Sequence, residues 1–346
     1  MNKEEKLKFI KKVESLVKPR DIQTIAFFSD FVKLMPKKIQ RRWSESGNKK
    51  IPYLAFVVEP YSFFLAYKIT DTAAAQEMLP EGYELVEATF IKSGEKFPMV
   101  IASVFSARTS AFAGIRAEFY IVARNKETGL VSWIISEYDT NTNSHDPAQG
   151  FGGHTANPAV LTINDQNELI VDVRRNIKNK KSKKNLEDEK EFVLIADLEN
   201  GKKKELDYSL WIEGNLSVDY GGELKSESKP FPLIFDPEML REGTQLPIQD
   251  VKVTSNTYLS GIIDPLNPVD ALVFPFTQHF VVKQDAKIHD IKTESDLKSN
   301  MKTFIERTDF KIMSGDDIKN PIFRSMFISF LISTGLIIFL LIKVFS

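Results

Sequence analysis

Short apolar runs, separated by glycine, proline, asparagine and aspartate, dominate the chain from Ile51 onward. These runs are rich in β-branched and aromatic residues, which favour strands. Their short, regular spacing predicts a mainly antiparallel β domain, a barrel or a sandwich. The predicted strands are YLAFVV, FFLAYKI, MVIASVF, EFYIVAR, SWIISEY, AVLTI, ELIVDV, EFVLIADL, YSLWI, DALVFPF and HFVVK.

Helical spacing of apolar residues appears in two stretches before this domain. Residues 3–17 carry one stripe, and a second stripe follows Pro19 until Pro36 interrupts it. The stripes consist of Leu7, Ile10, Val13 and Val17, then Ile22, Ile25, Phe28, Val32 and Met35. A third helix is predicted at DTAAAQEML, where Asp71 or Thr72 is the N-cap and Pro80 ends the segment.

The segment Ser325–Ile342 holds 18 residues without a charge, between Arg324 and Lys343. A helix needs about 20 apolar residues to cross a hydrocarbon core of ~30 Å, so this segment predicts a C-terminal transmembrane anchor. The alternative is a buried core helix. The N-terminus has no uninterrupted apolar run and does not resemble a signal peptide. Basic residues gather before the span, so the positive-inside rule predicts a cytoplasmic body. They are Lys302, Arg307, Lys311, Lys319 and Arg324, with only Lys343 after the span.

Charge divides the chain further. Residues 1–50 hold 14 Lys and Arg against 6 Asp and Glu, whereas the rest holds 32 against 41. The basic cluster KKIQRRW at 37–43 has two open interpretations: a solvated face of helices packed on the body, or an element on an anionic membrane surface. No recognition motif accompanies the charge, so no nucleic-acid partner is expected. The predicted organisation is a basic helical arm (1–50), a β domain (51–284), a polar stalk (285–320) and the anchor (321–346).

A glycine-rich stretch, QGFGGHTANPAV at 149–160, is the main candidate for chemistry. It is not a phosphate-binding loop, because no Lys-Ser/Thr follows it. His145, Asp146 and His154 lie close in sequence, but no third or fourth ligand with suitable spacing accompanies them, so no metal site is predicted. The chain has no cysteine, which excludes disulfides and thiolate chemistry. No cofactor is expected.

Several segments together resemble the acetoacetate decarboxylase-like family, over roughly residues 51–283. They are YKITDTAAAQEMLPEGYELV (67–86), AGIRAEFYIVAR (113–124), GFGGHTANPAV (150–160) and KPFPLIFDPEMLREGTQLPI. In the third segment Gly150, Phe151, Ala156 and Pro158 match the family's catalytic loop. The resemblance implies a mostly antiparallel, cone-shaped β-barrel with an internal pocket, with helices added at the N-terminus and the anchor at the C-terminus.

The family's chemistry is not retained in this loop. The resemblance implies a lysine that forms a Schiff base and a second lysine that lowers its pKa. Gly153 and His154 stand at these two positions. The family's arginine near its first strand and one of its two pocket carboxylates are also absent, because the matching segments read VVEPYS and VIASVF. Glu118 matches the remaining carboxylate.

Arg116, Glu118 and Tyr120 alternate along one predicted strand, so their side chains share a face. If that face points into a barrel, Arg116 and Glu118 must pair or bind a ligand, because lone buried charges are costly. If it faces water, the alternation is ordinary. His154 is either a general acid or base or a plain loop residue. The candidate ligand-binding residues are Arg116, Glu118, Tyr120, Phe151 and His154.

Three functional hypotheses follow from these patterns. The first is a membrane-held barrel that binds a small apolar or carboxylate-bearing metabolite or a lipid, without a Schiff-base lysine. The second is a lyase or hydratase that acts on an oxo acid through Glu118 and His154. The third is a scaffold that recruits partners to a membrane. Homo-oligomerisation stays open.

Overall fold

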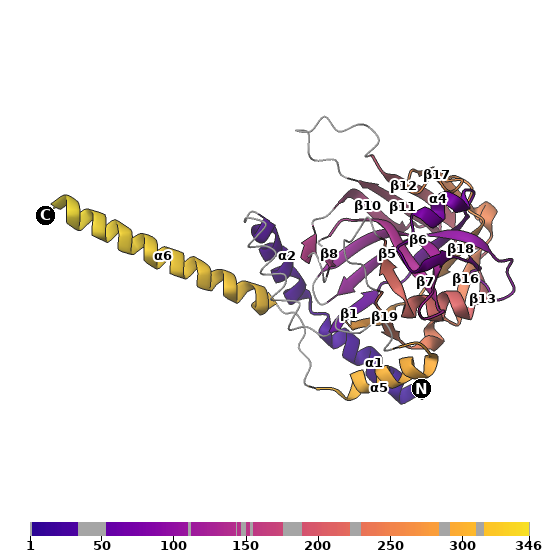
Figure 1. Ribbon diagram of the computed structural model, residues 1–346, viewed down its shortest axis with the longest axis horizontal. Helices are drawn as coiled ribbons and strands as arrows, with labels where there is room; N and C mark the ends of the chain where they lie inside the picture. Colours follow the sequence, from indigo (N-terminus) through magenta and orange to yellow (C-terminus); the bar gives the residue numbers. More distant parts are fainter. Residues whose placement is uncertain are drawn as a thin grey trace.

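The computed structural model describes residues 2–33, 53–109, 112–142, 144–146, 150–152, 155–175, 189–221, 230–283, 291–308 and 315–345. They form a β-rich α+β body from which one long helix projects (Figure 1). The sequence prediction of a mainly antiparallel β domain is confirmed, since every strand pair but one is antiparallel; the exception is β14 with β7.

Thirteen strands build the main sheet. They are β1 (Tyr53–Val58), β2 (Ser62–Lys68), β3 (Tyr83–Leu85), β4 (Glu87–Ala88), β5 (Phe97–Thr109), β6 (Ala113–Asn125), β7 (Val131–Thr140), β13 (Lys202–Glu205), β14 (Val218–Tyr220), β15 (Leu233–Phe235), β16 (Glu242–Leu246), β18 (Asp270–Phe274) and β19 (Gln278–Lys283). A second sheet contains β10 (Ala156–Ile163), β11 (Glu168–Arg175), β12 (Glu191–Asp197) and β17 (Val251–Asn256). Strands β8 (Ser144–Asp146) and β9 (Gly150–Gly152) form a separate two-stranded sheet.

The resemblance implied a cone-shaped β-barrel, but the main sheet stays open within the described part of the chain. One path through the main sheet runs β13-β16-β18-β2-β5-β1-β19-β15, and a branch continues from β5 through β6 and β7 to β14. Among the described residues, the branch and the end of the path meet only at the single bridge between Val218 and Phe231. Both end strands are three residues long, so they offer too few backbone groups for a continuous ladder. The sheet curves around its contents but does not close.

The long central strands bury both faces of the main sheet. Along β6, Tyr120 and Val122 belong to one core cluster, whereas Phe119 and Ile121 belong to the other, as strand alternation requires. The second sheet covers the Phe119 face, to which it contributes Leu169, Val171, Val173, Phe192 and Leu194. The Tyr120 face encloses the cavity described below.

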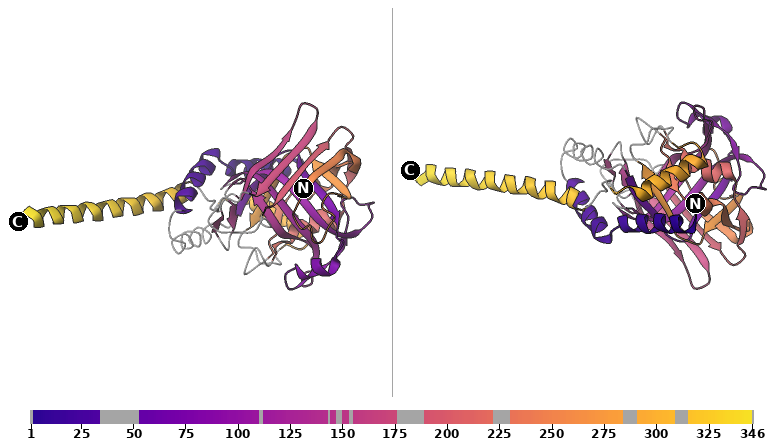
Figure 2. Two further views of the ribbon diagram at one scale, coloured as in Figure 1. Left: turned by 90° about the horizontal axis from the view of Figure 1, so that it is seen from above. Right: turned by 90° about the horizontal axis from the view of Figure 1, so that it is seen from below.

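Two helices from opposite ends of the chain pack side by side on the body. Helix α1 (Lys3–Leu16) and helix α5 (Glu294–Glu306) each begin with a capping box. Phe9 of α1 and Phe304 of α5 meet edge to face, with ring centroids 5.7 Å apart. The two helices are adjacent in Figures 1 and 2. Lys12 strengthens this contact, because its ammonium donates to the carbonyls of Phe304 (2.6 Å) and Ile305 (2.9 Å) at the end of α5.

This packing corrects two sequence predictions. Residues 294–306 are not part of a free stalk, because Leu297, Met301 and Phe304 are fully buried in the core. Leu7 was expected on the buried stripe of the first helix, but its side chain is 49% exposed. Phe9 is buried instead and is 1% exposed. Capping by Asn2 sets where α1 begins, and contacts with the body decide which face it buries.

Two local predictions have opposite outcomes. The helix at DTAAAQEML is confirmed as α4 (Thr72–Glu77), with Asp71 as its N-cap.

The predicted strand at YSLWI is wrong. This segment forms a π-helical turn, η2 (Ser209–Glu213), followed by the 3-10 turn η3 (Gly214–Leu216), because the Trp211 indole donates to the Phe90 carbonyl and is fully buried. Two more short turns are η4 (Pro237–Leu240) and η5 (Ile248–Asp250).

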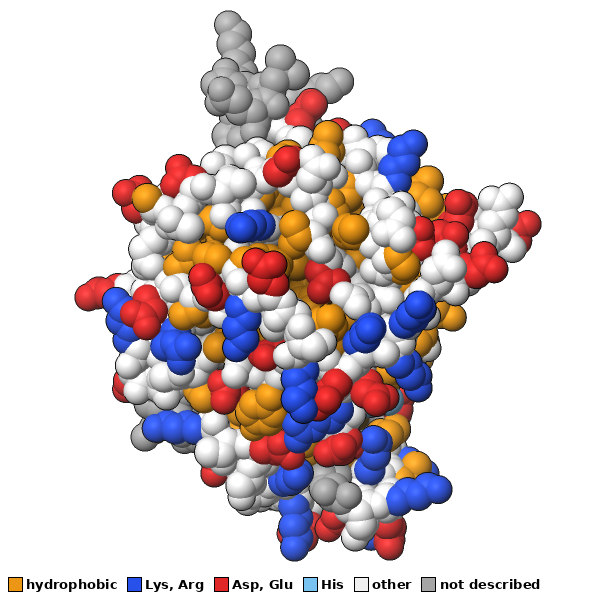
Figure 3. All heavy atoms as spheres, turned by 90° about the vertical axis from the view of Figure 1, so that its right-hand side faces the viewer, with side chains coloured by type: hydrophobic (Ala, Val, Ile, Leu, Met, Phe, Trp, Pro, Cys, Tyr) orange, Lys and Arg blue, Asp and Glu red, His pale blue; other side chains and the backbone are white. Residues whose placement is uncertain are grey.

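Helix α6 (Gly315–Phe345) extends away from the body (Figure 2). Within the described residues, its segment Ile322–Val344 is the one stretch long and apolar enough to span a bilayer. Most of its side chains are exposed, so the alternative of a buried core helix is wrong. Its first part packs on α2 (Pro19–Lys33), where Ile322 is buried. The face of the body that points away from α6 mixes positive, negative and apolar side chains (Figure 3).

Candidate functional site

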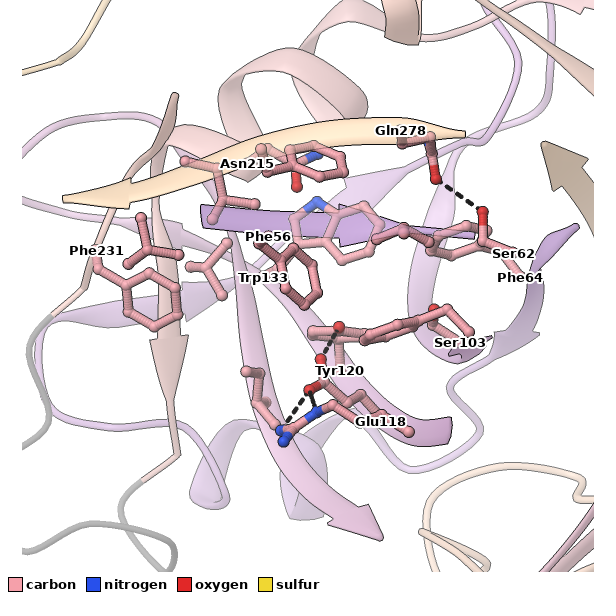
Figure 4. A pocket seen from close by; sticks show the side chains of 18 of the residues that line it. Phe56, Ser62, Phe64, Ser103, Glu118, Tyr120, Trp133, Asn215, Phe231 and Gln278 are labelled. Atoms are coloured by element: carbon pink, nitrogen blue, oxygen red, sulfur yellow. Dashed lines mark hydrogen bonds and ion pairs between the residues drawn. The ribbon is translucent and has the colours of Figure 1, made fainter. Parts of the chain in front are cut away.

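A half-open cavity of about 160 Å³ lies on the Tyr120 face of the main sheet. Residues from β1, β2, β5, β6, β7, β14, β15 and β19 surround it, together with η2 and η3. Its wall is mainly aromatic. The Trp211 ring packs edge to face against Phe64 and Trp133, with ring centroids 5.1 Å and 5.5 Å apart. Figure 4 shows Phe64 and Trp133 above Glu118 and Tyr120, which β6 supplies. The curvature of the sheet brings residues that are distant in sequence to one apolar space.

The polar group consists of Arg116, Glu118 and Tyr120. Two-residue spacing on β6 places all three on the cavity face, and each is 6% exposed. The Arg116 guanidinium donates from Nε to Glu118 Oε1 at 2.6 Å, and its Nη2 lies 2.6 Å from the same oxygen. The Tyr120 hydroxyl donates to Glu118 Oε2 (Figure 4). The structure therefore brings together the three residues that the strand alternation predicted.

The surroundings of Arg116 and Tyr120 raise the pKa of both side chains. Burial by itself would lower the pKa of Arg116, but the Glu118 carboxylate, with the nearby Tyr220 and Tyr138 hydroxyls, raises it above its ordinary value. Burial, followed by the same carboxylate, raises the pKa of Tyr120 well above its ordinary value. Arg116 is therefore a cation and Tyr120 a neutral donor throughout the physiological range. Arg116 also stacks on the Tyr138 ring, with Cζ 4.6 Å from the centroid.

Most other polar side chains around the cavity are occupied by protein partners. Both indoles donate to backbone carbonyls, Trp133 to Leu210 and Trp211 to Phe90, each at 2.8 Å. The Asn215 amide donates to Trp211 O at 2.7 Å. The Ser62 hydroxyl donates to Gln278 Oε1 at 2.8 Å (Figure 4). These bonds hold the wall in place but leave little for a ligand.

Ser103 differs from its neighbours. It is 1% exposed, lines the cavity, and is the one cavity-lining residue in the described part of the chain with a buried side-chain polar atom that lacks a hydrogen-bond partner. Ser103 lies opposite Glu118 in the register of β5 and β6. Sequence analysis missed it, although a lone hydroxyl within the apolar run MVIASVF was a visible signal. The contributions of Trp133 and Trp211 had no such signal, because they depend on how the sheet curves.

The predicted loop residues cannot be placed in the same way. Gly153 and His154 lie outside the described residues, and so does the side chain of Phe151, whose backbone belongs to β9. Thr155 lies just after the loop. Its backbone N–H donates to the Thr140 carbonyl (2.8 Å), and its hydroxyl accepts from the Thr140 backbone N–H (3.0 Å). Thr140 is the register partner of Arg116, so the chain leaves the loop beside the Arg116 end of the polar group. Within the described ranges, no group of three His, Asp or Glu side chains could hold a metal ion.

The β-rich α+β fold and its cavity can be compared with known proteins. No family model and no curated protein sequence matches the chain. Among solved structures, an acetoacetate decarboxylase from Legionella pneumophila matches 66% of this chain and 84% of its own, at 12% identity and a TM-score of 0.38. The enduracididine biosynthesis enzyme MppR matches over 69% and 88%, at 9% identity and a TM-score of 0.42.

A third similar structure is an acetoacetate decarboxylase-like enzyme from Sphingomonas wittichii, over 68% of this chain and 91% of its own, at 9% identity and a TM-score of 0.36. The resemblance predicted from the sequence motifs is confirmed in this sense: acetoacetate decarboxylase and acetoacetate decarboxylase-like enzymes are among the solved structures to which the chain is similar.

Proposed function

We propose that the protein is a membrane-anchored small-molecule-binding protein whose cavity holds a compact metabolite with a mainly apolar body. The observation that carries this proposal is the cavity itself: about 160 Å³, walled by aromatic rings, with a buried Arg116–Glu118–Tyr120 group at one side. Apolar walls with a few fixed polar groups are the usual composition of a ligand pocket.

The cavity volume limits the size of the ligand. An engineered protein cavity of about 150 Å³ with apolar walls accommodates benzene. A ligand of roughly that size fits here, whether it is a small apolar molecule or a short carboxylic acid. A membrane lipid would have to leave most of its acyl chain outside, so the volume favours a metabolite over a lipid.

The polar group supports binding more directly than Schiff-base chemistry. The described residues that line the cavity include no lysine, and glycine stands at the loop position where the family resemblance implies the nucleophile. An amine is required for an iminium with a carbonyl substrate. The described lining residues contain no such amine, which favours noncovalent binding over iminium formation.

Helix α6 supports the membrane part of the proposal. Its apolar segment Ile322–Val344 has 23 residues and, at 1.5 Å per residue, a length of ~35 Å, enough for a ~30 Å hydrocarbon core. The 25 positions before Ser325 contain five basic residues, whereas Lys343 is the basic residue at the C-terminal end of the apolar segment. This asymmetry favours a cytoplasmic body.

The binding proposal is tested by native mass spectrometry of full-length protein released from lipid nanodiscs. We expect a co-purifying small molecule that is lost in Leu233→Trp, because Leu233 lines the cavity and an indole would fill it. Leu266→Trp is the matched control, since Leu266 is half exposed and does not line the cavity. Equal ligand content in both variants, or none in the wild type, would contradict the proposal.

One contact favours a second candidate, a lyase or hydratase that moves a proton on an oxo acid. The Tyr120 hydroxyl donates to Glu118 inside the cavity, so these two groups could exchange a proton with a bound substrate. Solvent deuterium entering the carbon next to the ketone of acetoacetate or pyruvate, followed by NMR, tests it. Exchange that persists unchanged in both Glu118→Gln and Tyr120→Phe would exclude this role for the pair.

A further inference from the structure

The charge balance of the cavity narrows the class of ligand; this inference rests on the proposed binding function. Arg116 and Glu118 are one cation and one anion in direct contact, and Tyr120 is neutral, so the polar group has no net charge. The described lining residues contain no other Lys, Arg, Asp or Glu. A ligand anion would have to lose its water shell without gaining an unpaired cation, and uncompensated burial of a charge is costly.

Hydrogen-bond accounting leads to the same conclusion. Glu118 already accepts from Arg116 on Oε1 and from Tyr120 on Oε2. Ser62, Asn215 and both tryptophans donate to protein acceptors. A new anion would reach only the guanidinium N–H groups that Glu118 does not take, and it would share one positive charge with the Glu118 carboxylate beside it.

Ser103 offers what the charged pair does not. Ser103 lines the cavity, and its hydroxyl is fully buried and has no partner among the described residues. An unsatisfied buried hydroxyl destabilises the ligand-free state, and a ligand that bonds to it removes that cost. A hydroxyl is both a donor and an acceptor, so it can bind a carbonyl or an alcohol oxygen. Strand pairing with Glu118 places it beside the polar group, below the aromatic wall (Figure 4).

We infer that the cavity selects an uncharged molecule, with an apolar body about the size of a benzene ring and one hydroxyl or carbonyl oxygen that hydrogen-bonds to Ser103. The hydrogen-bonded group of Arg116, Glu118 and Tyr120 keeps that side of the cavity polar and rigid. Ser103 is the residue that distinguishes an oxygen-bearing ligand from a hydrocarbon.

Three probes of matched shape test this inference on the full-length protein in nanodiscs: 4-fluorobenzyl alcohol, 4-fluorotoluene and 4-fluorobenzoate. Fluorine NMR measures binding to the wild type, Ser103→Ala and Leu233→Trp, with empty nanodiscs as the reference for partition into lipid. We expect the alcohol to bind best and the benzoate worst. Ser103→Ala should weaken the alcohol roughly fivefold, the loss of one hydrogen bond, and leave fluorotoluene unchanged.

Thermal unfolding supplies an independent measurement without ligand. Ser103→Ala removes a hydroxyl that bonds to nothing, so its Tm should equal or exceed that of the wild type. A lower Tm would mean that the hydroxyl has a structural partner, and would overturn the inference. Benzoate binding more tightly than the alcohol would also overturn it, while leaving the binding proposal intact. Failure of all three probes together with absence of a co-purifying molecule would instead refute the binding function itself.

Discussion

Ser103 of β5 and Glu118 of β6 are directly opposite each other in the sheet, and both line the cavity, yet the serine hydroxyl makes no hydrogen bond to the carboxylate. The carboxylate is already held by Arg116 on one oxygen and by Tyr120 on the other. A neutral, internally satisfied group thus lies beside an unsatisfied hydroxyl. This arrangement separates the residues that maintain the cavity from the residue that can contact a ligand.

Breaking the buried ion pair should be costly, whereas replacing it should not. Glu118→Leu leaves the Arg116 guanidinium buried without its anion and should destabilise the protein by about 3–5 kcal/mol. The double variant Arg116→Met with Glu118→Leu should recover most of that loss, because two apolar side chains need no partner. Thermal unfolding followed by tryptophan fluorescence measures both, since Trp133 and Trp211 are buried in the wall of the same cavity.

The exposed pair Arg174–Asp172 on β11 is the control for this cycle. Asp172→Leu should cost far less than Glu118→Leu, because surface ion pairs contribute little. If the double variant at 116 and 118 were as unstable as Glu118→Leu alone, the pair would not be the source of the loss.

Borohydride should trap no covalent adduct with acetoacetate at a loop lysine. The described cavity wall holds no lysine, and the chain has glycine where the family resemblance implies the nucleophile. Without a neutral amine in reach of the substrate carbonyl, no iminium forms for the reductant to fix. Intact mass after treatment is the measurement. An adduct, mapped by peptide analysis, would reveal an unrecognised lysine nucleophile.

Acid should loosen the start of α5. Burial alone would raise the pKa of Glu294, but hydrogen bonds from Lys298 and Arg241 lower it below its ordinary 4.5. A lowered carboxylate pKa contributes stability that is complete above pH 4.5 and is lost as the pH falls through the lower folded-state value. The stability difference between wild type and Glu294→Gln should therefore shrink below pH 4.5. Hydrogen exchange of α5 amides as a function of pH measures this difference.

Arg241→Met is the matched variant for this test, because Glu294 stays in place while one of its cations is removed. In Arg241→Met, the stability of α5 should depend less on pH than in the wild type, as it does in Glu294→Gln. A difference between wild type and Glu294→Gln that stays constant from pH 7 to pH 3 would show that the contacts of Glu294 contribute no stability.

Removing α6 should release a folded body from the membrane. The full-length protein should stay in the membrane pellet after alkaline carbonate extraction, whereas a variant that ends at residue 314 should move to the supernatant. The two core clusters draw all their buried residues from the chain before residue 305, so near-UV circular dichroism of the truncated body should match the full-length signal. Extraction of the full-length protein by carbonate would contradict the anchor.

The sequence determined features that depend on local periodicity and on single residue types. Strand alternation predicted most strands and placed Arg116, Glu118 and Tyr120 on one face. Asp71 marked the start of α4, and an uncharged stretch marked the apolar part of α6. Each of these signals is contained in a short window, because side-chain period and capping depend on neighbouring residues only.

Only the tertiary structure decided which face of β6 lines the cavity and which other residues surround that cavity. The burial of Trp211 in a π-helical turn overrode the strand preference of YSLWI, and long-range packing with Phe9 placed α5 on the body instead of in a stalk. The Ser103 hydroxyl has no partner among the described residues although β6 sets Glu118 opposite it, and Arg116 and Tyr120 hold that carboxylate. Hydrogen-bond partners of a buried group come from strands that are remote in sequence, so no local pattern can specify them.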